Sequence, residues 1–310
     1  MSRIAIIDMG TNTFHLLLAE IGQSGVRILY RNHEAVRIGM AGINEGIISQ
    51  SACQRAIMAM KRFKGIMDEH AIRRTYAYGT SALRNARNGP ALVEEIRTVT
   101  GISVRIISGE EEADLIFAGI QSALHLGDQP NLVMDIGAGS VEFIIGNERD
   151  VFWKQSFEIG GQRLLEQFQK HDPITQEEIA AMDDYFRRTL TPLAIALGKW
   201  QPVVIVGSSG TFDTLSEIYC AQESLIYPCD ASETPLTIEG FYEIYHDLIR
   251  KNREERMKVK GMIPLRVEMI VVACCLVRFV LEQHHFESIR VSTYSLKEGA
   301  LAVIARSSSR

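Results

Sequence analysis

The sequence predicts an α/β protein built from two similar halves, and three observations support this prediction. Short apolar segments that suit buried strands alternate with segments of helical length along the chain. Residues 4–14, IAIIDMGTNTF, and residues 132–143, LVMDIGAGSVEF, both run from a strand through an aspartate and a glycine-containing turn into another strand. The element order that follows the first stretch is repeated after the second. We therefore expect a duplicated domain that binds its ligand between the halves.

The expected elements follow from apolar periodicity and from turn residues. The first half contains expected strands at 4–7, 14–20, 26–36, 75–78 and 104–107, and expected helices at 51–70, 90–100 and 111–125. The second half contains expected strands at 132–134, 141–145, 151–157, 203–206 and 289–291, and expected helices from 162, at 176–197, from 210, at 238–251, at 265–283 and from 296. Thr175 with Glu178, and Ser295 with Glu298, match the capping box that begins a helix.

The domain boundary is expected in the turn-rich link 126–131. This gives an N-terminal domain of residues 1–125 and a C-terminal domain of residues 126–310, and the final helix, 296–310, could pack back on the first domain. A chain of 310 residues suits two such domains.

Composition excludes several classes of protein. The net charge of −5 gives no general basic field for DNA or a membrane surface, so local cations and backbone N–H groups must hold any polyanion. The longest apolar stretch, 269–277, is too short to span a bilayer, and we see no signal peptide, so we expect a cytoplasmic protein. The five cysteines include no CxxC pair, which indicates buried free thiols and disfavours zinc. The apolar segment 269–280 suits a core helix or the interface of a homodimer.

Two turns carry the chemistry of phosphate binding. We call Gly10–Thr13 the first glycine turn and Gly137–Ser140 the second glycine turn. Glycine permits positive φ and close approach of other atoms, and successive N–H groups in such turns form an anion site. Hydroxyl donors come from Thr11, Thr13 and Ser140.

The aspartates before these turns, Asp8 and Asp135, would repel a phosphate unless a divalent cation such as Mg²⁺ lies between them. An ordinary hairpin with a capping aspartate would explain one such stretch. The presence of two favours the interpretation as phosphate and metal sites.

Three further stretches have both a functional and a structural interpretation. Thr80, Ser81 and Arg84 could bind an anion at a helix N-terminus, or the hydroxyls could cap the helix while the arginine is solvated. Glu112 could point into the ligand cleft, or it could stabilise the first turn of its helix together with its acidic neighbours. Residues 203–215, VVIVGSSGTFDTL, could hold a nucleotide sugar or base, or could form a close helix–strand contact.

Together these stretches resemble the exopolyphosphatase and guanosine pentaphosphate phosphohydrolase (Ppx/GppA) family, in the actin, hexokinase and heat-shock ATPase superfamily. The matching residues cover the chain from end to end: 8–13, 80–84, 108–113, 135–142, 207–211 and 292–299. The length matches the short form of the family, without the C-terminal extension. The resemblance implies two actin-like (ribonuclease H-like) domains with an active-site cleft between them.

The resemblance also implies the activity, a Mg²⁺-dependent release of terminal phosphate from polyphosphate, from pppGpp or from both. Glu112 would be the general base that activates water. The implied phosphate-binding residues are Gly10, Thr11, Asn12, Thr13, Thr80, Ser81, Arg84, Gly137, Gly139 and Ser140. The implied metal ligands are Asp8, Asp135 and Glu142, although Glu142 could instead be a surface residue on its strand. The implied nucleotide-binding residues are Gly207, Ser208, Ser209, Gly210 and Arg266.

Two alternatives stay open: a non-enzymatic sensor of (p)ppGpp, and a phosphotransferase or ATPase of the same superfamily. The candidate base, Glu112, is expected to activate a water molecule, which favours hydrolysis over transfer of phosphate to another acceptor. Glu158 stands where the family usually has an apolar residue, and an additional acid there disfavours long polyanions. We therefore expect a preference for short polyphosphate or a guanosine polyphosphate. Arg84, Arg87, Arg163 and the region of Arg266 are the candidate cations for a longer chain.

Overall fold

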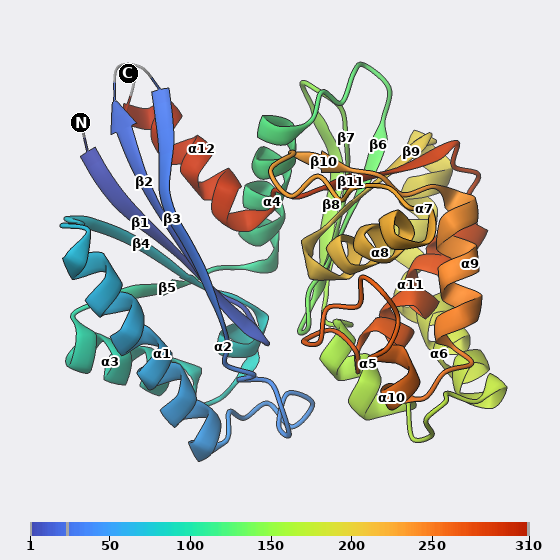
Figure 1. Ribbon diagram of the computed structural model, residues 1–310, viewed down its shortest axis with the longest axis horizontal. Helices are drawn as coiled ribbons and strands as arrows, with labels where there is room; N and C mark the ends of the chain where they lie inside the picture. The colour runs from blue at the N-terminus through green and yellow to red at the C-terminus, as the bar shows by residue number, and fades with distance from the viewer. Residues whose placement is uncertain (1, 23–24, 309–310) are drawn as a thin grey trace. The chain divides into compact units, whose positions relative to one another are not determined.

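The computed structural model describes residues 2–22 and 25–308, which form two compact units (Figure 1). The N-terminal unit contains residues up to 119 and the segment from 296 onwards. The C-terminal unit contains residues 120–295. The chain therefore leaves the first unit once and returns to it.

The N-terminal unit contains one sheet and four complete helices, and it includes most of a fifth, α4. In chain order its elements are β1 (Ser2–Met9), β2 (Thr13–Gly22), β3 (Gly25–Ala35), α1 (Gln50–Glu69), β4 (Arg74–Gly79), α2 (Ser81–Asn85), α3 (Gly89–Thr100), β5 (Val104–Ile106), α4 (Gly109–Ala123) and α12 (Leu296–Ser308). The strand order is β3-β2-β1-β4-β5, in which β1, β4 and β5 are parallel and β2 and β3 are antiparallel.

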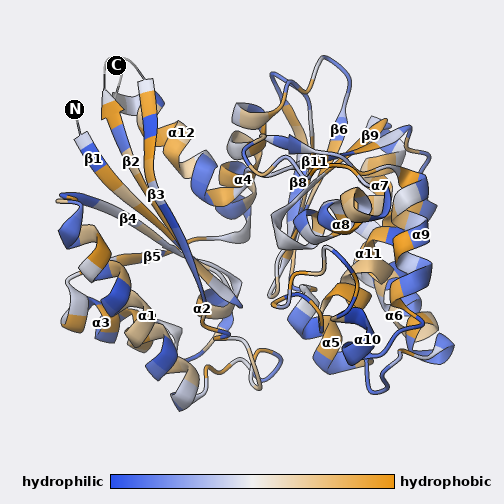
Figure 2. Ribbon diagram, in the orientation of Figure 1, coloured by the Kyte–Doolittle hydropathy of each residue, from blue (hydrophilic) through white to orange (hydrophobic). Residues whose placement is uncertain are grey.

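Both faces of this sheet are covered, because almost every residue of β1 from Ile4 to Met9 is buried. Ala5, Ile7 and Met9 belong to the core cluster shared with α1 and α3. Ile4 and Ile6 face the other side, where α12 packs against β1 and β2. Figure 2 shows the second half of the edge strand β3 as hydrophilic, which protects an exposed sheet edge from pairing with another chain.

Helix α12 belongs to the N-terminal unit through a close backbone contact with α4. A Cβ atom at Gly299 would lie 1.7 Å from the carbonyl oxygen of Leu115 and 2.7 Å from the N atom of Gly119. Only glycine therefore allows the two helices to approach this closely.

The C-terminal unit repeats the same sheet with additional helices. Its elements are β6 (Asn131–Ile136), β7 (Val141–Gly146), β8 (Val151–Phe157), α5 (Gly161–Phe168), α6 (Gln176–Thr189), α7 (Thr191–Trp200), β9 (Val204–Ser208), α8 (Ser209–Gln222), β10 (Glu233–Thr234), α9 (Ile238–Leu248), α10 (Arg253–Arg256), α11 (Ile270–Gln283) and β11 (Ser288–Ser292). The strand order is β10-β11-β9-β6-β7-β8.

The two sheets have equivalent topology. In each sheet the first strand of the unit is central, an antiparallel pair lies on one side, and parallel strands lie on the other. The order β8-β7-β6-β9-β11 corresponds to β3-β2-β1-β4-β5, and the short β10 is added at the edge. The predicted α/β fold with two duplicated halves is confirmed.

Two predicted helices are wrong in extent. Residues 176–197 form two helices rather than one, because Pro192 cannot continue a helix interior and Leu190 caps both α6 and α7. The helix expected from 265 begins only at Ile270, and the carbonyl of Val267, which would accept a helical hydrogen bond, instead accepts one from Arg256. The short α10 and β10 were not expected, and the helix expected to begin near Thr80 is the five-residue α2.

Other details agree with the sequence. Thr175 and Glu178 form the predicted capping box. The apolar helix α11 lies in the core of the C-terminal unit, so the alternative of an exposed interface on this helix is wrong. All five cysteines are free thiols, although Cys229 is exposed rather than buried. Within residues 2–22 and 25–308, we find no helix with the length and apolar character needed to cross a membrane.

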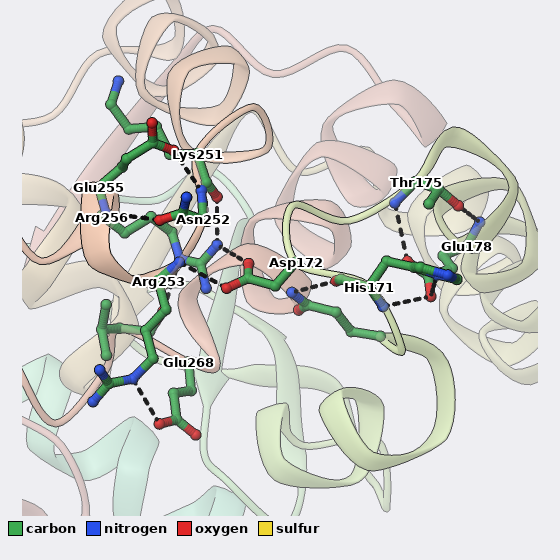
Figure 3. Close-up of polar contacts among 12 residues, drawn as sticks. His171, Asp172, Thr175, Glu178, Lys251, Asn252, Arg253, Glu255, Arg256 and Glu268 are labelled. Atoms are coloured by element: carbon green, nitrogen blue, oxygen red, sulfur yellow. Dashed lines mark hydrogen bonds and ion pairs between the residues drawn. The ribbon is translucent and has the colours of Figure 1, made fainter.

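A buried arginine holds together three segments of the C-terminal unit (Figure 3). The side chain of Arg256 is only 2% exposed and pairs with Asp172 over 2.6 Å. The same guanidinium donates to the carbonyl oxygens of Lys251 and Val267. Asp172 in turn accepts from the N–H of Arg253. The loop before α6, the start of α10 and the segment before α11 are thereby linked.

We predict that Arg256→Ala lowers the free energy of unfolding by about 3 kcal/mol, because the substitution removes the ion pair with Asp172 and leaves the carbonyl oxygens of Lys251 and Val267 without the guanidinium donor. Chemical denaturation of the purified protein measures this change. Arg187→Ala is the control, because it removes an exposed pair with Asp184 that contributes less than about 1 kcal/mol. Equal effects of the two substitutions would contradict the role of Arg256.

Candidate active site

The two glycine turns have the same local geometry. The N–H of Gly10 donates to the carbonyl oxygen of Thr13 over 3.1 Å, and the N–H of Gly137 donates to that of Ser140 over 3.0 Å. A Cβ atom at Gly10 or Gly137 would lie 2.9 or 3.0 Å from the same carbonyl oxygen. Any larger residue at the first position of either turn therefore has to displace its backbone.

Neither turn uses the positive φ that glycine permits. Glycines with positive φ in the described chain are at positions 25, 46, 101, 127 and 261, all outside the two turns. Close approach of the backbone, rather than left-handed conformation, is the reason for glycine at Gly10 and Gly137.

The carbonyl groups of the first glycine turn are occupied by a neighbouring segment. The N–H of Gly39 donates to the carbonyl oxygen of Thr11 over 3.1 Å, and that of Arg37 donates to Asn12 over 2.8 Å. Within the described part of the chain, the N–H groups of Thr11 and Asn12 have no acceptor. The turn therefore has free N–H donors, while its carbonyl oxygens are already hydrogen-bonded and turned toward the neighbouring segment.

The second glycine turn is held in a similar way by the start of α5. Three successive carbonyl oxygens accept hydrogen bonds from three successive N–H groups: 137 from 161 (3.0 Å), 138 from 162 (2.9 Å) and 139 from 160 (3.2 Å). A Cβ atom at Gly160 would lie 2.4 Å from the carbonyl carbon of Ala138. The N–H groups of Ala138 and Gly139 have no acceptor among the described residues. Both turns thus present free N–H donors.

Two hydroxyl groups in the first glycine turn are buried without a partner. Thr11 and Thr13 are each 5% exposed, and neither Oγ1 atom has a hydrogen-bond partner among residues 2–22 and 25–308. Burying an unsatisfied hydroxyl destabilises a protein. These two donors are therefore available to a ligand that the turn binds.

A row of polar side chains crosses the sheet of the C-terminal unit at the second glycine turn. Asp135 on β6 lies opposite Glu142 on β7 and beside Ser208 on β9. Ser156 on β8 and Ser292 on β11 extend the row on either side. Residues paired in this way share one face of the sheet, so the carboxylates of Asp135 and Glu142 lie side by side. Both are buried, at 4% and 1% exposure, so Glu142 is not a surface residue.

Serine hydroxyls surround these carboxylates. Asp135 accepts from Ser208, Ser209 and Ser295 at 2.6, 2.7 and 2.6 Å. Glu142 accepts from Ser156 at 2.7 Å. These hydrogen bonds restrict the orientation of the two carboxylates.

The donor set at this row fits a magnesium ion only in part. No group of three or more His, Cys, Asp or Glu side chains suited to a metal occurs in the described part of the chain. Mg²⁺ is commonly held by one or two carboxylates together with water and substrate phosphate oxygens. Asp135 and Glu142 fit this mode. Asp8 occupies the equivalent strand end in the N-terminal unit.

A corresponding polar row crosses the N-terminal sheet. Asp8 on β1 lies opposite His15 on β2 and beside Tyr78 on β4. His33 and Arg105 are the outer neighbours. The rings of His15 and His33 are 6.0 Å apart, and the guanidinium of Arg105 lies 5.3 Å from the centre of the Tyr78 ring. Burial raises the pKa of Tyr78, and the charge of Arg105 opposes this effect.

Glu112 and Arg84 form an ion pair within the N-terminal unit. Nη1 of Arg84 donates to Oε2 of Glu112 over 2.9 Å and to the carbonyl oxygen of Ile107 over 3.1 Å. Glu112 is 7% exposed, whereas its neighbour Glu111 pairs with Arg105 near the surface. Glu112 is therefore the inward-facing acid of the first turn of α4, and the alternative of a solvated Arg84 is wrong.

Thr80 and Ser81 lie beside the first glycine turn but do not cap a helix as expected. The hydroxyl of Thr80 donates to the carbonyl oxygen of Met9, and Thr80 makes no side-chain cap. The helix that follows, α2, contains only five residues. Its dipole is therefore small, and an anion at this position would depend on the hydroxyl groups.

Residues 207–210 form the predicted close contact between strand and helix. A Cβ atom at Gly207 would lie 2.1 Å from the ring of Phe212, and one at Gly210 would lie 2.1 Å from the guanidinium of Arg266. Burial lowers the pKa of Arg266, an effect opposed by Asp213 and Asp135. A small cavity lined by Gly137, Thr211 and Arg266, among others, lies at this contact. The assignment of this region to a nucleotide stays a prediction.

Glu158 is not an isolated acid. Its carboxylate pairs with Arg163 over 3.0 Å, and Nε of Arg163 donates to the carbonyl oxygen of Gly139 in the second glycine turn. The ion pair neutralises the negative charge of Glu158, which was expected to repel a polyanion. It also occupies Arg163, one of the candidate cations for a long chain.

The predicted site residues thus form one group in each unit. Asp8, the first glycine turn, Thr80, Ser81, Arg84 and Glu112 lie in the N-terminal unit, and the second glycine turn, Asp135, Glu142, residues 207–210 and Arg266 lie in the C-terminal unit. Ser295 was expected only to cap the final helix, and Arg37 and His15 were not expected at the site. Ser295 and Arg37 reach their sites through hydrogen bonds with residues distant in sequence. His15 lies opposite Asp8 because two consecutive strands pair in that register.

Comparison with known proteins agrees with these observations. The model of the Ppx/GppA phosphatase family matches residues 17–307. Over 296 residues the chain is 28% identical to a guanosine-5'-triphosphate,3'-diphosphate pyrophosphatase of Photobacterium profundum. That match covers 95% of this chain but only 58% of the relative, so the chain spans little more than half of that protein.

Solved structures extend the similarity along the whole chain. The crystal structure of an exopolyphosphatase from Cytophaga hutchinsonii is 43% identical with a TM-score of 0.96, and the match covers 99% of this chain and 98% of that one. The structure of a PPX-GPPA enzyme from Aquifex aeolicus is 26% identical with a TM-score of 0.80, and the match covers 97% and 99% of the two chains.

We predict that Thr11→Val does not destabilise the protein and raises its free energy of unfolding by up to about 1 kcal/mol, because valine has the shape of threonine without the unpartnered hydroxyl. Thr214→Val is the matched control. Its buried hydroxyl donates to the carbonyl oxygen of Gly210 over 2.7 Å, so this substitution should cost about 1 kcal/mol. Thermal and chemical denaturation measure both changes. A loss of stability in Thr11→Val equal to that of the control would show that the hydroxyl has a partner in the protein.

Proposed function

Because the chain belongs to the Ppx/GppA phosphatase family, we propose that it hydrolyses the terminal phosphoanhydride bond of inorganic polyphosphate or pppGpp. The observation that carries this proposal is the pair of glycine turns with free N–H groups and, in the first turn, two buried hydroxyls without partners among the described residues. Both features suit the oxygens of a phosphate group.

In the proposed reaction Glu112 is the general base. Its carboxylate takes a proton from water, the water oxygen attacks the terminal phosphorus, and the bond to the bridging oxygen breaks to release orthophosphate. Arg84 holds the carboxylate of Glu112 in one orientation. The base has to be a carboxylate because a protonated carboxyl group cannot accept the proton.

N–H groups and hydroxyls of a glycine turn would stabilise negative charge on a bound phosphoryl group. The proposed phosphate-binding residues are Gly10, Thr11, Asn12 and Thr13 of the first glycine turn and Gly137, Gly139 and Ser140 of the second. Mg²⁺ held by Asp135 and Glu142, with Asp8 as a further candidate ligand, would neutralise negative charge on the phosphate oxygens.

The substrate preference follows from the positions of the cations. Arg84 and Arg163 each pair with a glutamate of the protein, which leaves fewer positive charges for a long chain. We therefore propose short polyphosphate or a guanosine polyphosphate as the substrate, with residues 207–210 and Arg266 as candidates for nucleoside contacts. A cytoplasmic location and a homodimer stay predictions.

The direct test is phosphate release with Mg²⁺ from tripolyphosphate, long-chain polyphosphate, pppGpp and ATP. We predict that wild type hydrolyses at least one of the first three and that Glu112→Gln lowers kcat by about 10²–10⁴-fold, because glutamine keeps the shape but cannot take a proton. Glu110→Gln, in the same helical turn, is the control. Binding of pppGpp without hydrolysis would instead support a sensor, and transfer of phosphate to an acceptor other than water would support a phosphotransferase.

We further predict that Asp135→Asn raises the Mg²⁺ concentration for half-maximal activity by about tenfold or more, because the amide is a weaker ligand for a hard cation. Activity is measured over a Mg²⁺ titration, with circular dichroism as the check of folding. Asp230→Asn removes an exposed carboxylate and serves as the control. An unchanged Mg²⁺ titration would mean that Asp135 only orients the serine hydroxyls around it.

A further inference from the structure

The segment after β3 lies directly on the first glycine turn. Val36 and Ile38 are buried, at 3% and 0% exposure, and the arginine between them, Arg37, is exposed. The N–H groups of Arg37 and Gly39 donate to the carbonyl oxygens of Asn12 and Thr11, as described above. A Cβ atom at Gly39 would lie 2.4 Å from Cγ2 of Thr11, so the two segments are in close contact.

The backbone at Arg37 is anchored from a second side. On α1, Nε of Arg55 donates to the carbonyl oxygen of Val36 over 2.8 Å, and Nη2 donates to that of Arg37 over 3.0 Å. Both backbone polar groups of Arg37 are therefore bonded. The position of its Cα atom relative to the glycine turn is determined by contacts on both sides.

Arg37 has a backbone conformation that favours glycine. Its φ is 52°, in the left-handed region that costs energy for a residue with a Cβ atom. A purely structural position of this kind would be better served by glycine. The presence of a long cationic side chain therefore requires another explanation.

The surroundings supply that explanation. Within residues 2–22 and 25–308 the guanidinium of Arg37 makes no hydrogen bond or ion pair, and the hydroxyls of Thr11 and Thr13 are buried without partners in the adjacent turn. We infer that Arg37 is a further substrate-binding residue, which contacts a phosphate group of the polyphosphate moiety bound at the first glycine turn. This inference rests on the proposed function. Arginine suits the role because its planar guanidinium binds phosphate oxygens through two parallel hydrogen bonds.

Steady-state kinetics of phosphate release by the 310-residue chain test the inference. Arg37→Ala and Arg37→Gly should both raise KM by about ten- to a hundredfold, with kcat within about twofold, because a charge-assisted contact is lost in binding. Arg37→Lys should recover part of the loss. Arg37→Gly should melt no lower than wild type, since glycine accepts the left-handed conformation. Arg73→Ala is the control and should match wild type. Arg73 is exposed and directly precedes β4, whose other end lies next to Thr80.

A binding measurement separates this inference from the proposed function. Calorimetric titration with tripolyphosphate reports binding whether or not hydrolysis follows. If wild type binds tripolyphosphate without hydrolysing it and Arg37→Ala weakens that binding, the inference stands and the proposed function fails. If wild type hydrolyses the substrate and Arg37→Gly has unchanged KM and unchanged tripolyphosphate affinity, the inference is overturned. Wild type that does not bind tripolyphosphate at all also overturns it.

Discussion

The register of the strands beside each central strand is the constraint on which the candidate site depends. The pairing of β6 with β7 places Asp135 directly opposite Glu142, and only this register puts the two carboxylates on one face of the sheet. A shift of one residue would turn one carboxylate toward the apolar core, where Met134 and Phe143 now lie. The same constraint aligns Asp8 with His15 and Tyr78 in the other unit. Apolar packing on the opposite face therefore positions the charged groups.

Both glycine turns are supported by a neighbouring segment in the same way. A neighbouring backbone segment occupies the carbonyl oxygens of the turn, which leaves its N–H groups free. The segments differ: an irregular chain after β3 acts on the first turn and the start of α5 acts on the second. The two halves thus share the geometry of the turn, while the element that supports it differs between them. The first half adds an exposed arginine, and the second adds a row of serines.

The fold and the two turns could be predicted from the sequence because their signals are local. Apolar periodicity, Asp135 at a strand end, and glycines before hydroxyl residues all occur within a few positions of one another. The pairing of Arg84 with Glu112 and the donation from Ser295 to Asp135 join residues far apart in the chain, and no local pattern encodes them. The break at Leu190 was missed although Pro192 signals it. The left-handed conformation of Arg37 could not be predicted, because it depends on anchors from Asn12 and Arg55.

The return of the chain to the N-terminal unit has a consequence for biosynthesis. Residues 120–295 are continuous in the chain. The C-terminal unit is therefore synthesised as one segment and can fold as soon as that segment has left the ribosome. The N-terminal unit begins to emerge first but is completed last, because α12 covers one face of β1 and β2 and meets α4 at Gly299. Until residues 296–308 have been synthesised, the apolar side chains of Ile4 and Ile6 lack part of their cover and are exposed to chaperones.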